Sequence, residues 1–382
     1  MTDVDGRQLL DLSMGFGAML AGHLNPVVVE EAKAALDTGM LFVTPSPIST
    51  DAAERICRRF GIDQVRFTNS GTESTMYAVR VARSATGKSD IVKVEGGYHG
   101  SYDPFVVSSK PSLEKAGDAE EPTPVADSNL VTGNVFVVPY NNPDALERIF
   151  EKHSKTISCF IVEPVLENIG IVLPDAGYLE RVRDLCDQFG IVLIFDEVMT
   201  GFRVALGGAQ SVYAKLIPGF EPDMTVMGKV IGGGMPLAAF GAKRAVMEQL
   251  APLGAVYQAG TLSGNPVATA CGLATLAEIR KPGFYEALGA RTRSLVTGLK
   301  AAADAEGVPF CGDSEGGMFG FFLLPELPQD YPTVMKTDGA KFNTLFHGLL
   351  DRGVYIAPAL YEAGFVSAAH TDEDIATTVA AA

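Results

Sequence analysis

Tryptophan is absent from this 382-residue chain, and cysteine and histidine are scarce, with five residues of each. The cysteines are scattered without a CxxC pair, which argues against a disulfide framework and favours free thiols in a reducing compartment. The histidines are equally dispersed and no HExxH motif occurs, so the usual zinc ligands are not grouped in the sequence. We therefore predict a cytoplasmic protein without a metal site.

Basic residues are also in deficit. Lys and Arg number 30 against 46 Asp and Glu, a formal charge of −16, which argues against nucleic acid or an anionic membrane as a partner. No apolar run approaches the roughly 20 residues that a membrane-spanning helix needs. The polar, acidic opening MTDVDGRQLLD does not resemble a signal peptide. The same stretch predicts a hairpin turning at Asp5-Gly6, and we expect a further segment upstream of it.

The remaining composition is typical of a large globular protein. Hydrophobic residues make up 47% and charged residues 20%, which is enough for a sizeable core. Strand-like apolar runs alternate with helical patterns, which predicts an α/β fold with a mostly parallel sheet flanked by helices. The predicted strands are Gln64–Thr68, Asp90–Val94, Val135–Val138, Cys159–Val162 and Ile191–Phe195. The predicted helices are Pro26–Leu36, Thr50–Phe60, Thr72–Arg83, Pro143–Lys152, Tyr178–Phe189 and Pro266–Arg280.

The order of these elements suggests two domains. We predict a large domain over residues 44–280 and a smaller α+β domain built from both ends of the chain, residues 1–43 and 281–382. The stretch 108–133, rich in proline, alanine and acidic residues, interrupts the alternation. It is either a mobile surface loop or a lid over a site.

One motif follows a predicted buried strand. In GIVLIFDEVMTGFR, residues 190–203, Asp196 and Glu197 come at the carboxyl end of the strand, where open α/β sheets bind ligands. Two acids there could form a Walker-B-like metal site, but such a site needs a P-loop. Gly87-Lys88-Ser89 has an alanine where the first glycine of a P-loop belongs. Alone, this motif leaves metal binding and simple capping of the next turn both open.

A second group of motifs could hold a phosphate and a ring. In FTNSGTES, a strand leads into a helix, and Ser70 to Glu73 fits an S-x-x-E capping box. Such a helix start is either an ordinary cap or a phosphate site made of free N–H groups and hydroxyls. GGYHG, residues 96–100, then places Tyr98 and His99 on a glycine-rich loop, where a planar ring could stack.

A third group contains a secluded amine. VMGKVIGGGMP, residues 226–236, sets Lys229 between an apolar segment and three glycines, where burial could lower its pKa. YQAGTLSGNP, residues 257–266, leads into a helix and is not a GxSxG elbow. A phosphate cradle, an aromatic plate, a strand-end carboxylate and a lysine together match pyridoxal 5′-phosphate. Lys229 would form an imine with its aldehyde, and Asp196 would keep its ring nitrogen protonated.

These motifs identify a family. The segments NSGTES, YHG, EPV, DEVMTGFRVALGGAQ, GKVIGGGMP, YQAGTLSGNP, GGMFG and GVYIAPALYEAGFVSAAHT resemble the class III pyridoxal-phosphate aminotransferases across nearly the whole chain. Within that family the similarity is greatest to members that move an amino group within one molecule. The resemblance implies fold type I (aspartate aminotransferase-like). It also implies a small amino or keto substrate, pyridoxamine 5′-phosphate as the alternate cofactor form, and a homodimer with active sites at its interface.

The resemblance also implies roles for individual residues. The residues expected to hold the phosphate are Ser70, Gly71 and Thr72, with Thr261 reaching the neighbouring subunit's cofactor. Tyr98 is expected to stack on one ring face and Val198 on the other, with Asn168 near the ring's 3′-oxygen. Glu362 is expected to place a carboxylate in the substrate pocket. His99 follows the family pattern too, with loop packing and contact with a reacting group both open.

Departures from the pattern concern the substrate side. Where family members of the within-molecule type carry Ser-Trp, this chain has Gly15-Phe16, which places Phe16 beside the substrate. The stretch 108–133 also lacks their glycine- and serine-rich composition. Three interpretations follow: transfer within one molecule, transfer between two molecules such as an amine or β-amino acid and a keto acid, or a retired non-enzymatic scaffold. Retention of Lys229 and Asp196 argues against the third.

Overall fold

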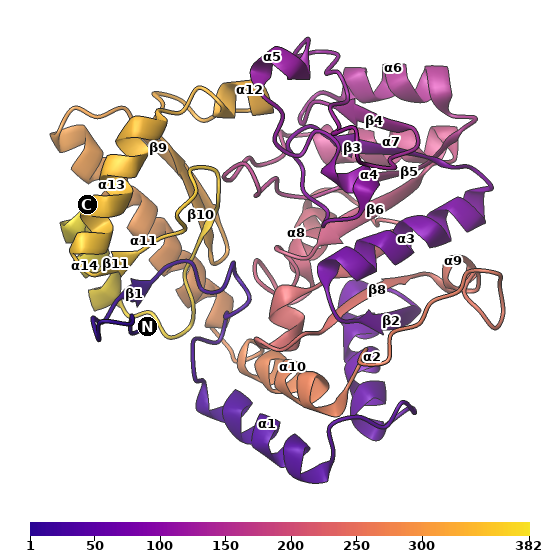
Figure 1. Ribbon diagram of the computed structural model, residues 1–382, viewed down its shortest axis with the longest axis horizontal. Helices are drawn as coiled ribbons and strands as arrows, with labels where there is room; N and C mark the ends of the chain where they lie inside the picture. The colour runs from indigo at the N-terminus through magenta and orange to yellow at the C-terminus, as the bar shows by residue number, and fades with distance from the viewer.

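The computed structural model describes residues 1–382. Its centre is a seven-stranded sheet in the order β2-β8-β7-β6-β5-β3-β4 (Figure 1). The strands are β2 (Gln64–Thr68), β3 (Asp90–Val94), β4 (Val135–Val138), β5 (Ile157–Val162), β6 (Val192–Glu197), β7 (Met224–Met227) and β8 (Ala238–Ala242). Only β8 runs against the others, because it pairs antiparallel with both β2 and β7. The predicted mostly parallel sheet is thus confirmed.

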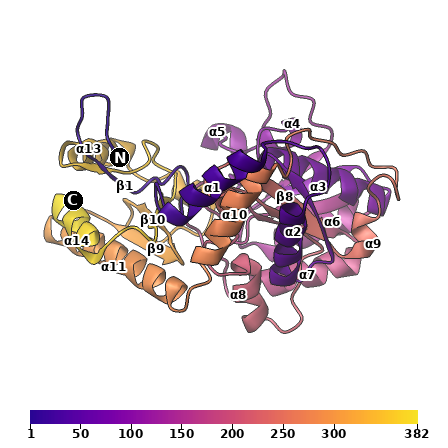
Figure 2. The ribbon, with the colours of Figure 1, turned by 90° about the horizontal axis from the view of Figure 1, so that it is seen from below.

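Helices cover both faces of this sheet (Figures 1 and 2). Alternate side chains of a strand point to opposite faces of the sheet, so each buried strand contributes side chains to the hydrophobic cores on both faces. In β5, Cys159 and Ile161 pack with α3, whereas Phe160 and Val162 pack with α6 and α7. The helices of this region are α2 (Pro47–Phe60), α3 (Gly71–Thr86), α4 (Asp103–Val106), α5 (Leu113–Ala116), α6 (Pro143–His153), α7 (Tyr178–Phe189), α8 (Gly208–Leu216), α9 (Arg244–Met247) and α10 (Pro266–Glu278), with a 3₁₀ turn η1 (Lys229–Gly232).

The C-terminal part forms a second layer beside the sheet (Figure 1). Its three-stranded antiparallel sheet has the order β12-β10-β9, and its other elements include long helix α11. These elements are α11 (Phe284–Ala305), β9 (Cys311–Glu315), β10 (Met318–Phe322), α12 (Tyr331–Val334), α13 (Gly339–Asp351), β11 (Val354–Tyr355), β12 (Gly364–Phe365) and α14 (Asp372–Ala381). No helix is long and apolar enough to cross a membrane.

The N-terminal residues join both parts. Strand β1 (Leu10–Asp11) pairs in parallel with β11, with Leu10 opposite Val354, so the start of the chain belongs to the C-terminal layer. Helix α1 (Pro26–Thr38) instead packs along α10 of the sheet region (Figure 2). The boundaries predicted at residues 43 and 280 stay a prediction. The predicted hairpin is confirmed by a bridge between Thr2 and Gln8, with Gly6 in the left-handed region (φ 83°).

Candidate active site

The predicted functional residues gather at one edge of the large sheet. Strands β2, β3, β5, β6 and β7 are parallel, so their carboxyl ends meet at this edge. Asp196 lies at the end of β6, and Lys229 follows β7 by two residues. Asp196 is paired with Val226 of β7, three residues before Lys229, so Asp196 and Lys229 lie near each other at this edge. Both line one cavity of about 220 Å³, together with residues from the ends of the other strands.

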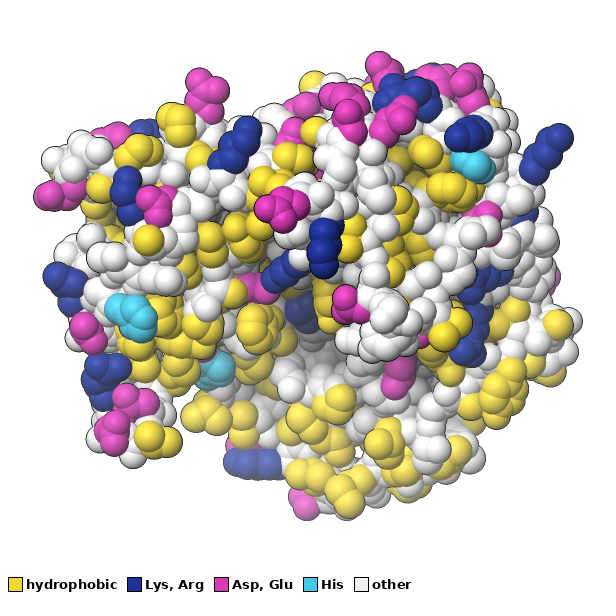
Figure 3. Space-filling view, turned by 45° about the horizontal axis from the view of Figure 1, so that its top comes forward, with side chains coloured by type: hydrophobic (Ala, Val, Ile, Leu, Met, Phe, Trp, Pro, Cys, Tyr) yellow, Lys and Arg dark blue, Asp and Glu magenta, His cyan; other side chains and the backbone are white.

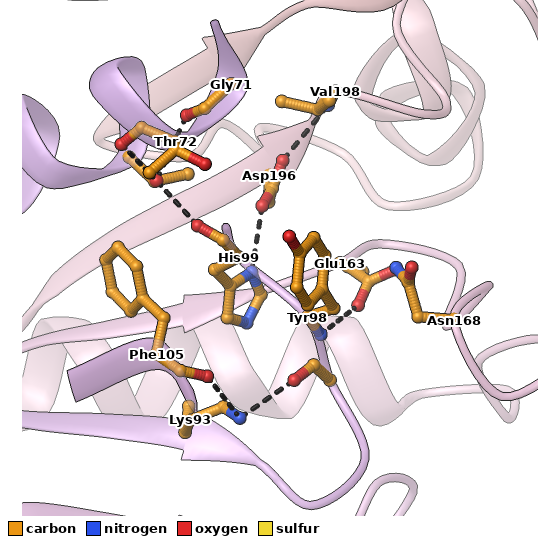
Figure 4. A network of polar contacts seen from close by, with 12 residues as sticks. Gly71, Thr72, Lys93, Tyr98, His99, Phe105, Glu163, Asn168, Asp196 and Val198 are labelled. Atoms are coloured by element: carbon orange, nitrogen blue, oxygen red, sulfur yellow. Dashed lines mark hydrogen bonds and ion pairs between the residues drawn. The ribbon is translucent and has the colours of Figure 1, made fainter. Parts of the chain in front are cut away.

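Asp196 is buried and held from two sides (Figure 4). Its Oδ1 accepts from the Val198 backbone N–H at 3.1 Å, and its Oδ2 lies 2.8 Å from His99 Nδ1. The side chain is 5% exposed. Carboxylate oxygens have further lone pairs, so Asp196 can still accept from a cationic ring nitrogen in the cavity. This carboxylate can therefore pair with a protonated pyridine ring.

His99, for which loop packing and contact with a reacting group were both open, lies beside Asp196. Its imidazole is fully buried against Asp196, its backbone C=O accepts from Thr75 Oγ1 at 2.7 Å, and its ring packs edge-on against Phe105 (Figure 4). The physical reason is the tight approach of loop 96–100 to α3, where a Cβ on Gly100 (φ 97°) would lie 2.7 Å from Thr72 Cα. His99 thus orients Asp196, and the YHG motif contained no signal for that pairing.

Lys229 sits in a strained and crowded place. Its φ is 50°, a left-handed conformation that side-chain-bearing residues adopt only under constraint. The glycines that follow let the chain pass close to α10, because a Cβ on Gly233 would lie 2.7 Å from the Cys271 carbonyl oxygen. Burial lowers the pKa of Lys229, and nearby carboxylates, Asp196 foremost, oppose that shift. The amine is thereby brought closer to its nucleophilic, neutral form.

This shift predicts how cofactor uptake depends on pH. The neutral amine is the nucleophile, so lowering the pKa moves the onset of reaction to lower pH. We expect the rate at which cofactor-free protein takes up pyridoxal phosphate to rise with pH around a midpoint below 10.5, the ordinary value for lysine. Stopped-flow absorbance would measure it, with Nα-acetyl-lysine as the reference amine. A midpoint equal to that of the reference would contradict the account.

The start of α3 offers the groups expected for a phosphate. Ser70 is the N-cap, and its Oγ accepts from Glu73 N–H at 3.2 Å. The reciprocal half of the predicted capping box is shifted by one residue, because Glu73 accepts from the backbone of Asn69 at 2.8 Å. The N–H groups of Gly71 and Thr72 lack acceptors within the helix, and both residues line the cavity. Ser70 itself caps the helix and does not line that cavity.

The expected ring-contacting residues surround the same space. Tyr98, Asn168 and Val198 all line the 220 Å³ cavity. Glu163, which sequence reasoning did not single out, ties two of them together: it accepts from Tyr98 N–H at 2.9 Å and from Asn168 Nδ2 at 2.8 Å (Figure 4). Burial raises the pKa of Glu163. The EPV motif was the available signal, and the structure explains it as a brace for the ring-binding loop.

Thr261 lies apart from this group. It is exposed and lines a surface cavity of about 290 Å³ together with Leu41, Phe42 and Val43. Within one chain it is therefore not brought to the cavity that contains Lys229. Its expected role toward a neighbouring subunit stays a prediction.

A larger cavity of about 710 Å³ opens next to the first, and Lys229, Tyr98 and Asn168 line both. Phe16, half exposed, and Glu362 also line the larger cavity, and their roles toward a substrate stay predictions. The stretch 108–133 forms one wall of this cavity, and the space-filling view shows a hollow between the two parts of the molecule (Figure 3). The eight residues of the stretch 108–133 that line this cavity are Ser108, Ser109, Lys110, Pro111, Val125, Ala126, Asp127 and Leu130.

The base of that wall is fixed by a buried lysine. Lys93 Nζ donates to the backbone carbonyls of Phe105 at 3.2 Å (Figure 4), Gly97 at 2.8 Å and Val107 at 2.6 Å. These three bonds tie the loop that bears Tyr98 to the start of stretch 108–133. Burial lowers the pKa of Lys93 to about 7, against the opposing charges of Glu163 and Glu95.

Removing that amine should destabilise the protein. We expect Lys93→Met to lower the free energy of unfolding by about 3 kcal/mol, since three buried carbonyls lose their donor. Urea denaturation followed by circular dichroism would measure it. Lys152→Met, at an exposed site on α6, is the matched control and should change little. Equal stability of the two variants would contradict this role.

The fold and this arrangement of lysine, carboxylate and helix start define a pyridoxal-phosphate-dependent enzyme. The model of the family described as "Aminotransferase class-III" matches residues 1–371, and the chain belongs to that family. A glutamate-1-semialdehyde 2,1-aminomutase from Albidiferax ferrireducens is 60% identical over 381 residues, which cover 100% of this chain and 87% of the relative.

Two solved structures extend the comparison. An omega-transaminase from Sphaerobacter thermophilus is 32% identical with a TM-score of 0.92, and the match covers 100% of this chain and 87% of that one. A glutamate-1-semialdehyde-aminomutase from Pseudomonas aeruginosa PAO1, solved in complex with PMP, is 25% identical with a TM-score of 0.87. The match covers 100% of this chain and 84% of that one. The expected fold type, cofactor and enzyme class are confirmed.

The residues present fit this cofactor. A carboxylate at the cavity floor suits a ring nitrogen, first-turn N–H groups of α3 suit a phosphate, and Lys229 supplies the amine. Asn168 Nδ2 and the Asp196 carboxylate add polar atoms to residues that line the same cavity.

Proposed function

We propose that the enzyme moves an amino group between neighbouring carbons of glutamate 1-semialdehyde to give 5-aminolevulinate. The observation that carries the proposal is the 60% identity, over the full length of this chain, to a relative named for that activity. Substrate and product are isomers, so the reaction needs no second substrate. A cavity with two carboxylates and two amines among its lining side chains near the cofactor suits an amino acid aldehyde of this size.

The cofactor, when bound, supplies an electron sink for the bond that is broken at the substrate carbon. We assign Asp196 to hold the proton on the ring nitrogen, with His99 fixing the carboxylate at 2.8 Å. Tyr98 and Val198 hold the ring from its two faces, and the α3 N-terminus holds the phosphate. Lys229 would remove and return the proton at the substrate carbon whose bond to hydrogen is broken.

The test is turnover of glutamate 1-semialdehyde alone. We expect purified, cofactor-loaded enzyme to form 5-aminolevulinate without any added keto acid, measured by chromatography of the product. Absence of the product, with the cofactor bound and the protein folded, would refute the mutase proposal.

A second candidate is amino transfer between two molecules. It is favoured by Phe16 in the cavity wall and by the likeness to the omega-transaminase, whose TM-score and identity exceed those of the solved aminomutase. Its test is whether pyruvate or 2-oxoglutarate restores the original cofactor spectrum after the enzyme has reacted with an amine or β-amino acid. Failure of a broad acceptor panel would count against it.

We also propose that the enzyme is a homodimer with sites at the subunit interface. Exposed apolar side chains gather where Thr261 lies, with Phe42 50% and Val43 72% exposed. Covering them with a second copy would bring Thr261 to that copy's phosphate. Light scattering should give about twice 40.4 kDa, and a monomer in solution would contradict the proposal. Five unpaired cysteines favour the proposed cytoplasmic location.

A further inference from the structure

We propose that Arg203 is a positioning residue that fixes where Phe16 lies in the larger cavity beside Lys229. The proposal deepens the proposed function and rests on it for the nature of the substrate that Phe16 meets. It gives Arg203 a role in substrate binding although its side chain lines neither of the two cavities. That role is exerted through the turn that carries Phe16, residues 14–17.

The turn that carries Phe16 has an unusual backbone. Met14, Gly15, Phe16 and Gly17 all have positive φ, at 46°, 60°, 51° and 83°. The left-handed conformation is unfavourable for residues with a side chain, which adopt it singly rather than in runs. Strain of this kind persists only where the surrounding structure holds the backbone. The place of Phe16 therefore depends on the contacts that hold this turn.

Two of these contacts come from the layer of the molecule to which the turn belongs. Asp11, in β1, accepts through Oδ1 from the backbone N–H groups of residues 13 and 14, at 2.8 Å and 3.0 Å. At the other end of the turn, a Cβ on Gly17 would lie 2.8 Å from Phe365 Cε1, so a glycine lets the backbone lie this close to the ring. Both contacts fix the shape of the turn, but neither joins it to strand β6 of the large sheet.

Arg203 supplies the connection to β6, because it lies on the segment that follows this strand. Its Nη2 donates to the Gly17 carbonyl, and its Nη1 donates to the carbonyls of Gly317 at 3.3 Å and Val366 at 3.2 Å. Its guanidinium also lies over the ring of Phe365, with 4.9 Å between Cζ and the ring centroid. One side chain thus joins the segment after β6 to the turn and to the strands beside it.

Arg203 keeps its charge although it is fully buried. Burial lowers the pKa of Arg203 to about 10, and the nearby carboxyl of Glu167 opposes that shift, so the side chain is cationic at neutral pH. Hydrogen bonds from a charged donor are stronger than neutral ones. The planar fork of arginine also reaches several carbonyls at once in a fixed geometry, whereas a lysine ammonium is a point charge on a flexible stem.

Phe16 is the residue through which the position of the turn reaches the cavity. Its side chain lines the 710 Å³ cavity together with Lys229. Without the bond from Arg203, the Gly17 carbonyl loses its tie to the segment after β6, and the ring of Phe16 gains freedom to move relative to Lys229. Substrate binding should weaken before the chemistry does, because Lys229 and Asp196 keep the positions that the large sheet gives them.

The absence of tryptophan from the chain allows a direct test. In the cofactor-loaded Phe16→Trp variant, time-resolved fluorescence anisotropy reports the motion of that side chain alone. We expect Arg203→Lys, added to Phe16→Trp, to raise the amplitude of nanosecond motion at least about twofold. Phe365→Leu removes the ring beside Gly17 and keeps the arginine. It should act in the same direction, and it decides the question if Arg203→Lys does not fold.

Tyr285→Phe is the matched control. Tyr285 Oη donates at 2.7 Å to the carbonyl of Phe202, the residue before Arg203, so this variant removes a side-chain hydrogen bond to the same segment without changing a contact of the turn. It should leave the anisotropy of Phe16→Trp as it is. An unchanged amplitude in folded Arg203→Lys, an unchanged amplitude in Phe365→Leu, or an equal rise in Tyr285→Phe would overturn the proposal.

Kinetics with the natural Phe16 test the consequence for the substrate. We expect Arg203→Lys to raise KM for glutamate 1-semialdehyde about tenfold while kcat changes less than about twofold. In a Phe16→Ala background, Arg203→Lys should raise KM no further, because the residue through which it acts has been removed. An equal rise in both backgrounds would contradict the role of Arg203. If no 5-aminolevulinate forms while the anisotropy result holds, the mutase proposal alone is refuted.

Discussion

Lys229→Ala is expected to lower kcat by about 10³-fold or more, because the same amine attaches the cofactor and carries the proton. The variant should also lose the cofactor on gel filtration and lack the visible absorbance of the loaded enzyme. Steady-state assays and absorbance spectra measure both effects. No other lysine lines the 220 Å³ cavity, so no neighbour can substitute.

Two further variants separate chemistry from charge and folding. Lys229→Arg keeps the positive charge without a nucleophilic amine, and it should be as inactive as Lys229→Ala. Lys152→Ala, at an exposed site on α6, removes a lysine without approaching the cavity and should retain full activity. Substantial turnover by Lys229→Ala in folded protein would remove Lys229 from the mechanism.

Asp196→Asn should produce the second-largest loss. The amide has nearly the same shape but no negative charge, so it cannot hold a proton on the ring nitrogen. We expect kcat to fall by at least about a hundredfold, comparable to removal of a key electrostatic group, while the melting temperature changes little. The absorbance maximum of the bound cofactor should shift, because the protonation of the ring changes. Retention of kcat in the variant would contradict the role assigned to Asp196.

The adjacent carboxylate provides a matched comparison. Glu197 points away from the cavity and accepts from Thr200 Oγ1, from Ala209 N–H at 2.9 Å and from Gln210 N–H at 2.6 Å. Glu197→Gln sets an amide donor among these donors and should lower the free energy of unfolding by about 1–3 kcal/mol. The folded fraction should keep its cofactor spectrum and activity. The two neighbouring acids would thus differ: the Asp196 variant loses activity but keeps its stability, and the Glu197 variant loses stability but keeps its activity.

Periodicity and end signals predicted the elements that carry strong local patterns. Strands β2, β3 and β4 and helix α7 have the predicted bounds, because apolar runs or helical faces end at clear breakers there. Strands β7 and β8 were not predicted. MTVM spans only four residues, and AAFGA is rich in small residues with low strand propensity, so both depend on pairing with β6 and with each other.

The site was predictable where one residue type performs one chemical task. Lys229 and Asp196 were identified from the sequence, and the fold brings them together because their strands are adjacent. Contacts between distant segments were not predictable, among them His99 with Asp196 and Lys110 with Glu362. Such pairs depend on how far each loop travels over the sheet edge, and no local pattern encodes that path.

The most direct test of the central claim, that Lys229 and Asp196 hold opposite parts of one cofactor, is a crystal structure with pyridoxal phosphate bound. The account predicts continuous density from Lys229 Nζ to the cofactor and an Asp196 oxygen within about 3 Å of the ring nitrogen. Density joined to a different lysine, or a ring nitrogen more than about 4 Å from Asp196, would contradict it.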